Sequence, residues 1–347
     1  MSSKESMKKE PISLFPGSNT CAGFAGFFED IRQAAKRTVI LKGGPGVGKS
    51  TLMREAGQRW EAQGLSVVYY RCSGDPDSLD AVFAKETGFL VLDGTAPHIM
   101  DPACPGAADS ILNLGICLKE DVLRKELPVI QDIQAESARR YARATRCLAA
   151  AERFRADAAA VYKHALPEAQ RRELSEQLFR SLPDGPEGAC RRAFAQAVTC
   201  KGVIQCLDGI LENRVICLDV PWGFDVHSLL LPLLHEAQRR RAAVHVYADP
   251  LDAEKIGHLA VGDTLFTTAV MMDAPVLAPA FDREKLAREN SALAFDKAVY
   301  ELALHQAVEA LADAKQCHDR LERVYIDAMD YAVLKAVKQE FLESLPQ

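Results

Sequence analysis

The chain has 347 residues, of which 48% are hydrophobic and 26% charged. This composition is typical of a globular protein, and the length favours two domains. The net charge of −6 argues against a broad nucleic-acid-binding surface. No stretch approaches the roughly 20 apolar residues of a membrane-spanning helix. The polar N-terminus lacks the apolar segment of a signal peptide, so we expect a cytoplasmic protein without a membrane partner.

The ten cysteines are scattered along the chain. None lies in a C-x-x-C pair and no secretory signal precedes them, so we expect reduced, mostly buried thiols. Cys317 and His318 are adjacent inside a helical pattern without partner ligands, which argues against a zinc site there.

The sequence repeats itself. Five segments of the first half return in the same order in the second: 20–24 at 199–203, 37–41 at 213–217, 75–76 at 249–250, 161–162 at 324–325 and 181–183 at 344–346. Five ordered matches indicate tandem copies of one domain. Glycine and proline cluster in residues 184–189, which predicts a linker. We therefore expect a flexible tail over residues 1–12, a first domain over 13–183 and a second over 190–347.

Each copy predicts an α/β core followed by a helical segment. In the first copy we expect strand 38–42, helix 48–62, strands 66–72 and 88–92, and a helical stretch over 119–182. In the second we expect strand 214–218, helix 226–241, strand 243–248, a weaker strand 264–269 and a helical stretch over 283–345. The alternation of strands and helices predicts a parallel sheet covered by helices. The length of each helical stretch favours a helical hairpin.

The strongest motif lies between strand 38–42 and helix 48–62. The phosphate-loop pattern G-x-x-x-x-G-K-[ST] is complete there. The loop consists of Gly43, Gly44, Pro45, Gly46, Val47, Gly48, Lys49, Ser50 and Thr51. Its glycines let backbone N–H groups point at phosphate, and Lys49 would reach the β- and γ-phosphates. The Ser50 hydroxyl would bind Mg²⁺, and Thr51 could contact the α-phosphate.

Asp93 is the expected second ligand of the magnesium ion. It ends the apolar run 89–92, which is the Walker B pattern, and parallel strands bring their C-terminal ends to one crevice. The next residue is Gly94, where motor-like and transport ATPases usually carry a glutamate that activates water. Its absence argues against a fast ATPase of that kind.

Three carboxylates, those of Asp75, Asp77 and Asp80, follow strand 66–72. In small-molecule kinases an aspartate from this region accepts the proton of the attacking hydroxyl, and we select Asp77 and Asp75 as candidates. Turn formation and helix capping explain these aspartates as well. His98, on the loop after Asp93, is a candidate for sensing the γ-phosphate or binding substrate, although a loop histidine is more often merely exposed.

The second copy lacks the nucleotide chemistry. No lysine occurs between Lys201 and Lys255, and the position that matches Asp93 falls near Thr267. We expect this half to have a structural or regulatory role. The alternative is that it binds another ligand through Trp222 and His227.

With GGPGVGKSTLM, CSGDPDSLDAV and VLDGTAPHIMDP, the chain resembles a bacterial family of tandem P-loop proteins labelled ATPase or predicted nucleotide kinase. The resemblance covers nearly the whole chain. It implies nucleotide binding by residues 43–51 and magnesium at Asp93. Both halves often carry a P-loop in that family, whereas here only the first does, which argues against two ATP sites.

The expected function is Mg²⁺-dependent ATP binding with hydrolysis or phosphoryl transfer at one site in the first half. The absence of an N-K-x-D guanine-binding motif after Asp93 favours ATP over GTP. One alternative is a nucleotide-sensing scaffold that binds a protein partner with negligible hydrolysis. Another is a small-molecule or nucleotide kinase. The sequence names neither the acceptor nor the partner, and it does not give the oligomeric state.

Overall fold

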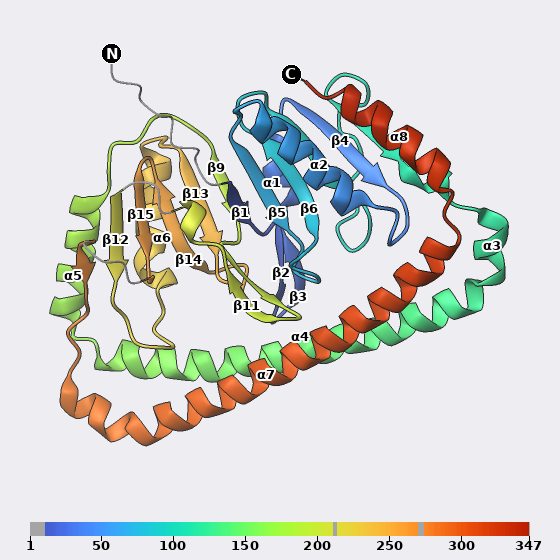
Figure 1. Ribbon diagram of the computed structural model, residues 1–347. Coiled ribbons are helices and arrows are strands. Elements are labelled where there is room, and N and C mark those ends of the chain that lie inside the picture. The colour runs from blue at the N-terminus through green and yellow to red at the C-terminus, as the bar shows by residue number, and fades with distance from the viewer. Residues whose placement is uncertain (1–10, 211–213, 270–273, 347) are drawn as a thin grey trace, which may run out of the picture.

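The computed structural model describes residues 11–210, 214–269 and 274–346, and it has the expected α/β class with two six-stranded sheets (Figure 1). Most of the predicted tail, residues 1–10, lies outside the described residues. Ile12, however, belongs to the first strand rather than to a tail, because it pairs with Val68.

The first half contains the sheet with strand order β1-β5-β6-β7-β4-β8. Its strands are β1 (Ile12–Leu14), β2 (Gly17–Thr20), β3 (Gly23–Gly26), β4 (Arg37–Lys42), β5 (Val67–Arg71), β6 (Leu79–Ala84), β7 (Phe89–Asp93) and β8 (Asp109–Asn113). Its helices are α1 (Phe28–Gln33), α2 (Lys49–Ala62), the short 3-10 helix η1 (Leu114–Cys117), α3 (Glu120–Lys125), α4 (Leu127–Ala165) and α5 (Glu168–Ser181).

The second half repeats this order, because its sheet runs β9-β13-β14-β15-β12-β16 when read from β9. Its strands are β9 (Cys190–Ala193), β10 (Gln196–Thr199), β11 (Gly202–Gln205), β12 (Arg214–Leu218), β13 (Val244–Ala248), β14 (Ile256–Val261), β15 (Thr264–Thr267) and β16 (Val276–Leu277). Its helices are η2 (Asp208–Ile210), α6 (His227–Arg239), α7 (Arg283–Asp327) and α8 (Tyr331–Glu343). The repeat inferred from short sequence matches is therefore a repeat of topology.

Each sheet contains one antiparallel strand that the sequence analysis did not assign. Strand β6 runs antiparallel to both β5 and β7, and β14 lies in the same way between β13 and β15. All six residues of β6 are buried, so the strand lacks the polar and apolar alternation that marks a half-exposed strand. The sheets are therefore mostly parallel, as expected, with one antiparallel strand in each.

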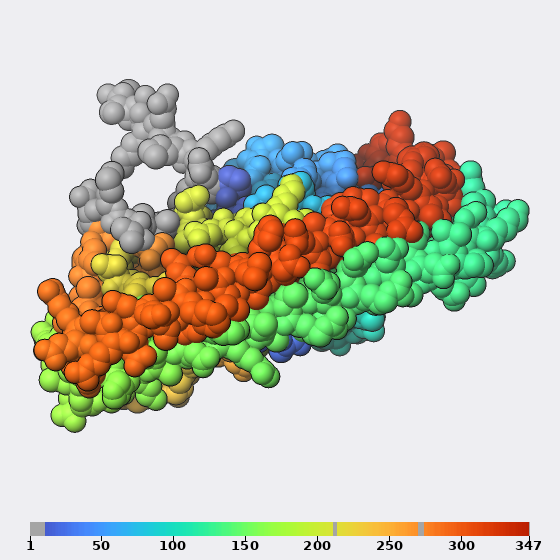
Figure 2. Space-filling view, turned by 90° about the horizontal axis from the view of Figure 1, so that it is seen from below, coloured from blue at the N-terminus to red at the C-terminus, as the bar shows by residue number. Residues whose placement is uncertain are grey.

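The two long helices pair with each other instead of forming a hairpin within each half. Helices α4 and α7, of 39 and 45 residues, lie side by side along the molecule beneath both sheets (Figures 1 and 2). At about 1.5 Å per residue they are roughly 60 and 70 Å long. Small buried side chains at their contact include Ala144, Ala151, Ala307 and Ala310. Small residues let the two helix axes approach closely and pack at the density of a protein core.

The short helices after α4 and α7 are exchanged between the halves. Leu334, Phe341 and Leu342 of α8 are buried in the core of the first half, together with Trp60 of α2. In the same way, α5 contributes Leu174 and Leu178 to the core of the second half, next to α6. The cores therefore do not follow the sequence boundaries at 13–183 and 190–347, since each half is completed by a helix from the other. The predicted linker, residues 184–189, contains neither helix nor strand apart from an isolated bridge at Glu187.

Because α8 packs in the core of the first half, removing its buried Phe341 side chain is predicted to cause a large loss of stability. Phe341 is 7% exposed, and Phe341→Ala is expected to cost about 3–5 kcal/mol because it leaves a cavity in the first half's core. Phe295→Ala on α7 is the matched control, since that ring is 61% exposed and its loss should cost less than about 1 kcal/mol. Thermal unfolding of both variants measures the difference. Equal effects would show that α8 does not contribute to this core.

Candidate nucleotide site

The phosphate loop joins β4 to α2 and has the backbone that its glycines allow. Gly43, Gly46 and Gly48 have φ angles of 145°, 71° and 84°. Residues with a Cβ atom rarely adopt these values, so the curled backbone depends on glycine at the three positions. The loop leads directly into the N-terminus of α2, whose free N–H groups and positive dipole end favour an anion.

Lys49 and Asp93, which the sequence analysis assigned separately to phosphate and to magnesium, meet at this loop. Strands β4 and β7 are parallel neighbours, and their register places Leu41 beside Asp93. The Lys49 Nζ atom lies 3.6 Å from Asp93 Oδ2, and the two side chains are only 10% and 14% exposed. The same ammonium donates hydrogen bonds to the carbonyl oxygens of Gly43 and Gly44, at 3.1 and 3.0 Å. Lys49 is thus positioned over the loop with a carboxylate beside it.

Ser50 and Asp93 have the chemistry that the predicted magnesium ion requires. The Ser50 Oγ atom accepts a hydrogen bond from the Leu79 backbone N–H at 2.9 Å, which fixes the hydroxyl at the edge of the sheet. Thr51 is exposed on the first turn of α2. Among the described residues there is no group of three or more His, Cys, Asp or Glu side chains that could form a metal site. Mg²⁺ bound to a nucleotide takes most of its ligands from phosphates and water, so one hydroxyl and one or two carboxylates suffice.

Asp80 is a site residue that the sequence analysis passed over. It directly precedes Ala81, which pairs with Leu92, so Asp80 stands beside Asp93 across the antiparallel pair β6 and β7. The residue is 4% exposed. Burial raises the pKa of its carboxyl to about 7, and the nearby charge of Asp93 adds to this effect. A carboxyl that titrates near neutral pH beside a phosphate loop is a candidate general base.

The side chains of Asp75 and Asp77 contact their own turn and two lysines, whereas Asp80 stands beside Asp93. The Asp75 carboxylate caps its own turn, since it accepts hydrogen bonds from the Asp77 N–H and the Ser78 hydroxyl, and Lys315 Nζ lies 3.4 Å from it. The exposed Asp77 side chain pairs with Lys201 of the second half. The structure therefore favours Asp80 over both as the acid beside Asp93. Assigning strand β6 from the sequence would have identified Asp80 as a site residue.

His98 lies on the loop that follows Asp93. Its ring stacks on Phe28 with a centroid distance of 4.3 Å and an interplanar angle of 9°. Both ring nitrogens are buried and have no hydrogen-bond partner among the described residues, and burial lowers the pKa of the imidazole. Lys42 Nζ holds this loop through the carbonyl oxygens of Gly94 and Met100, at 2.9 and 2.7 Å. His98 is thus a half-buried residue whose two shielded ring nitrogens are unused, rather than a fully exposed loop residue.

Gly94 has no room for a side chain. A Cβ atom at this position would lie 2.3 Å from the Ile40 Cγ2 atom and 3.0 Å from the Met100 carbonyl oxygen. The glutamate that motor-like ATPases carry after the Walker B aspartate is therefore excluded by packing.

Residues of α7 and α8 cover the phosphate loop. A Cβ atom at Gly44 would lie 2.4 Å from the Tyr325 ring, and one at Gly46 would lie 3.1 Å from Ile326. A Cβ atom at Gly48 would lie 3.1 Å from the Lys338 Nζ atom. The loop is thus built by the first half and covered by the second half, which also brings a further cation to it.

The second half keeps the positions of this site with different side chains. His227 Nδ1 accepts the Ile256 N–H at 3.1 Å, as Ser50 does from Leu79 in the first half. By the strand register, Gly257 and Thr268 take the positions of Asp80 and Asp93. His258 and Thr267, which take the positions of Ala81 and Leu92, form a hydrogen bond of 2.8 Å. Burial lowers the pKa of His258 to about 4, so this ring is neutral at pH 7. Neither Gly257 nor Thr268 is acidic, and no lysine occurs between Lys201 and Lys255.

The two residues proposed as an alternative ligand site, Trp222 and His227, line one cavity of about 390 Å³. Arg155 of α4 reaches it and binds Asp249 through two hydrogen bonds of 2.7 Å. A Cβ atom at Gly223 would lie 2.8 Å from Ala158, so α4 covers this loop as α7 covers the first one.

No protein-family model, curated protein or solved structure matches the chain. No helix in the described part of the chain is long and apolar enough to cross a membrane. The class of protein supported by the fold is a tandem α/β protein with one complete phosphate loop.

The raised pKa of Asp80 predicts that Asp80→Asn increases the stability of the folded chain, and that this increase depends on pH. Between about pH 4, the ordinary pKa of an aspartate, and about pH 7 the folded chain keeps a proton that the unfolded chain releases. Wild-type stability therefore falls as the pH rises through this window. The amide does not ionise. The free energy of unfolding of the variant, relative to that of wild type, should therefore rise by about 2–4 kcal/mol from pH 4 to pH 8.

Urea unfolding at both pH values, with chelator and without nucleotide, measures this gain. The control is Asp77→Asn, because that carboxylate is exposed and should show no such gain. A difference between Asp80→Asn and wild type that does not change with pH would contradict the assignment.

Proposed function

We propose that the chain is a Mg²⁺-dependent, ATP-binding protein with one nucleotide site, in the first half, and that it transfers or releases the γ-phosphate slowly. The observation that carries this proposal is the contact between Lys49 and Asp93 over a loop with three glycines at positive φ. Glycine-rich loops of this kind present backbone N–H groups to phosphate. The family resemblance of the sequence agrees with it.

Each residue has a defined task in this proposal. The loop N–H groups and Lys49 bind the β- and γ-phosphates, while Ser50 and Asp93 hold Mg²⁺. The ion, when bound, neutralises charge on the phosphate oxygens. Asp80 accepts a proton from the attacking hydroxyl or water, since its pKa of about 7 suits a general base at neutral pH. Lys338 adds positive charge near Gly48.

Two features support a small-molecule kinase over a fast ATPase. The position after Asp93 has no room for the water-activating glutamate. The phosphate loop is also covered by Tyr325 and Ile326, and exclusion of water favours transfer to a bound acceptor over hydrolysis. His98, with two unpaired buried nitrogens, is the candidate contact for that acceptor.

A nucleotide-sensing scaffold is the second candidate, and the path of α7 favours it. The helix contacts the phosphate loop near its C-terminal end and runs along α4 beneath both halves. A change in the loop on nucleotide binding would therefore act on a helix that reaches the other end of the molecule. A protein partner would detect the nucleotide state through that helix.

The ten cysteines are all free thiols in the part of the chain that the structure describes. Reduced thiols suit a reducing compartment, so we place the protein in the cytoplasm.

Nucleotide binding is tested with a fluorescent ATP analogue titrated in the presence of Mg²⁺. Lys49→Ala should weaken binding at least about tenfold, because it removes a charge-assisted contact to phosphate. Lys125→Ala, an exposed lysine on α3, is the matched control and should bind like wild type. Equal affinity of Lys49→Ala and wild type would disprove the proposed site.

Measuring ATP turnover distinguishes the kinase hypothesis from the scaffold hypothesis. ADP formation is measured with Mg²⁺ and ATP, alone and with a panel of nucleosides, nucleoside monophosphates and sugars as acceptors. A kinase should form ADP only with the right hydroxyl acceptor, and Asp80→Asn should slow it about 100-fold or more, whereas Asp77→Asn should not. Turnover no higher than that of Lys49→Ala with every acceptor would leave the scaffold as the function.

A further inference from the structure

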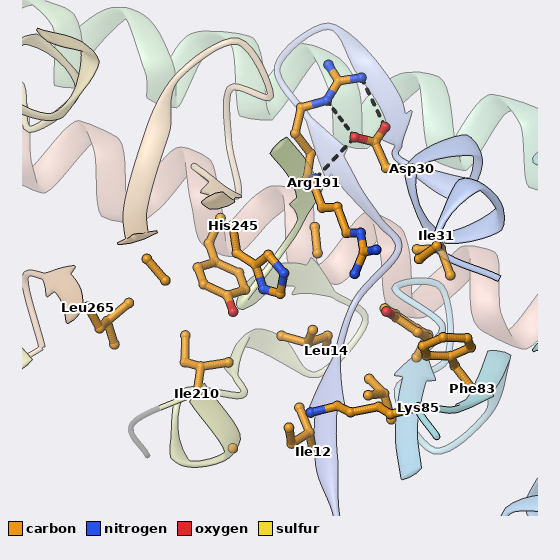
Figure 3. A pocket seen from close by; sticks show the side chains of 18 of the residues that line it. Ile12, Leu14, Asp30, Ile31, Phe83, Lys85, Arg191, Ile210, His245 and Leu265 are labelled. Atoms are coloured by element: carbon orange, nitrogen blue, oxygen red, sulfur yellow. Dashed lines mark hydrogen bonds and ion pairs between the residues drawn. The ribbon is translucent and has the colours of Figure 1, made fainter. Parts of the chain in front are cut away.

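A cavity of about 460 Å³ lies between the two halves and is separate from the nucleotide site (Figure 3). Strands β1, β5 and β6 of the first half and β9, β13, β14 and β15 of the second contribute to its walls. Neither the phosphate loop nor Asp80 or Asp93 lines it. Its volume is within the range of about 300–1,000 Å³ typical of small-molecule pockets.

Most of the wall is apolar. Leu14, Phe83 and Leu265 are buried side chains that line it, and Ile31 of α1 and Ile210 of η2 complete the apolar surface. These residues come from both halves, so any molecule in the cavity touches both sheets. An apolar surface of this kind gains free energy by covering a hydrophobic body.

Basic groups converge on the same space. In Figure 3 the side chains of Arg191, His245 and Lys85 surround it. Arg191 and His245 are direct neighbours across β9 and β13. His245 is exposed as a residue but its ring lines the cavity, and desolvation of the ring lowers its pKa, as do the charges of Arg191 and Lys85. The buried residues Tyr70 and Tyr247 also line the cavity and bring hydroxyl groups to it.

The charge of Arg191 is not cancelled by the carboxylates at the cavity. Among the described residues two carboxylates line it, those of Asp30 and Asp263, beside Arg191 and Arg192. Asp30 is already paired with Arg192, whose Nη2 atom lies 3.0 Å from Asp30 Oδ2. Asp263 is exposed and contacts the neighbouring Thr264 hydroxyl. The charge of Arg191 is therefore not neutralised by either carboxylate.

The repeat shows that the fold does not require these basic residues. Phe15 and Phe194 exchange two backbone hydrogen bonds of 2.9 Å where the halves meet, and this marks equivalent positions. The cross-strand pair Arg191 and His245 then corresponds to Ile12 and Val68 on β1 and β5. An apolar pair thus fills the same place in the first half.

We propose that this cavity binds a small amphipathic organic anion, with its acidic group held by Arg191, His245 and the tyrosine hydroxyls and its apolar body packed between the two sheets. Because the ligand would contact both halves at once, it would act as a bridge between them. This site does not depend on the nucleotide proposal, and its test uses no nucleotide.

The probe is 1-anilinonaphthalene-8-sulfonate, which has an aromatic body and one sulfonate, titrated into the full chain and followed by fluorescence. Arg191→Ala is expected to weaken binding about tenfold to a hundredfold, because it removes a charge-assisted hydrogen bond. Ala260→Phe is expected to weaken it at least as much, since a ring there fills the cavity. Phenylalanine is tolerated at the equivalent position of β6, where Phe83 pairs with Val68 as Ala260 pairs with His245.

Arg214→Ala, an exposed arginine that does not line the cavity, is the matched control and should bind as wild type does. Circular dichroism and the unfolding temperature of each variant show that it is folded. Decanoate should displace the probe, and decanol at the same concentration should not. Equal probe binding by wild type, Arg191→Ala and Ala260→Phe would overturn the proposal, as would absence of probe binding or equal displacement by decanol.

Discussion

The packing of α4 against α7 is the contact on which the rest of the molecule depends. Because each long helix crosses beneath both sheets, the short helix that follows it reaches the opposite half. This places Tyr325, Ile326 and Lys338 over a phosphate loop encoded nearly 300 residues earlier. Each of the two α/β halves is therefore completed by a helix of the other, and the second half covers the loop of the first.

The pseudo-symmetry shows which features the fold requires and which serve chemistry. Both halves fix the start of the helix after the loop to the antiparallel strand, through Ser50 in one and His227 in the other. The acidic pair Asp80 and Asp93 is replaced by Gly257 and Thr268. Since both sheets keep the same strand order, this strand order does not depend on the acidic pair. The presence of the pair on one side only supports the proposed nucleotide site.

Local patterns gave the sequence analysis its correct results, and long-range packing limited it. The strand and helix around residues 43–51, the strand that ends at Asp93 and the segments that reveal the repeat are short stretches of sequence, and the structure has these elements and this repeat. Strand β6 was missed because it is buried on both faces and contains a charged residue, so Asp80 was treated as part of a turn. The exchange of α5 and α8 could not be predicted, because the amphipathic pattern of a helix shows that one face is buried but not which core buries it.

The exchange of α8 has a consequence for how the protein is made. A ribosome releases the phosphate loop and the whole first sheet long before it releases residues 331–343, yet those residues complete the core around Trp60 and Met53. The nascent first half is thus left with an uncovered apolar surface while nearly half of the chain is still being synthesised. Vectorial synthesis would therefore yield the covered phosphate loop only after residue 343 has emerged, and products truncated before α8 would lack this cover.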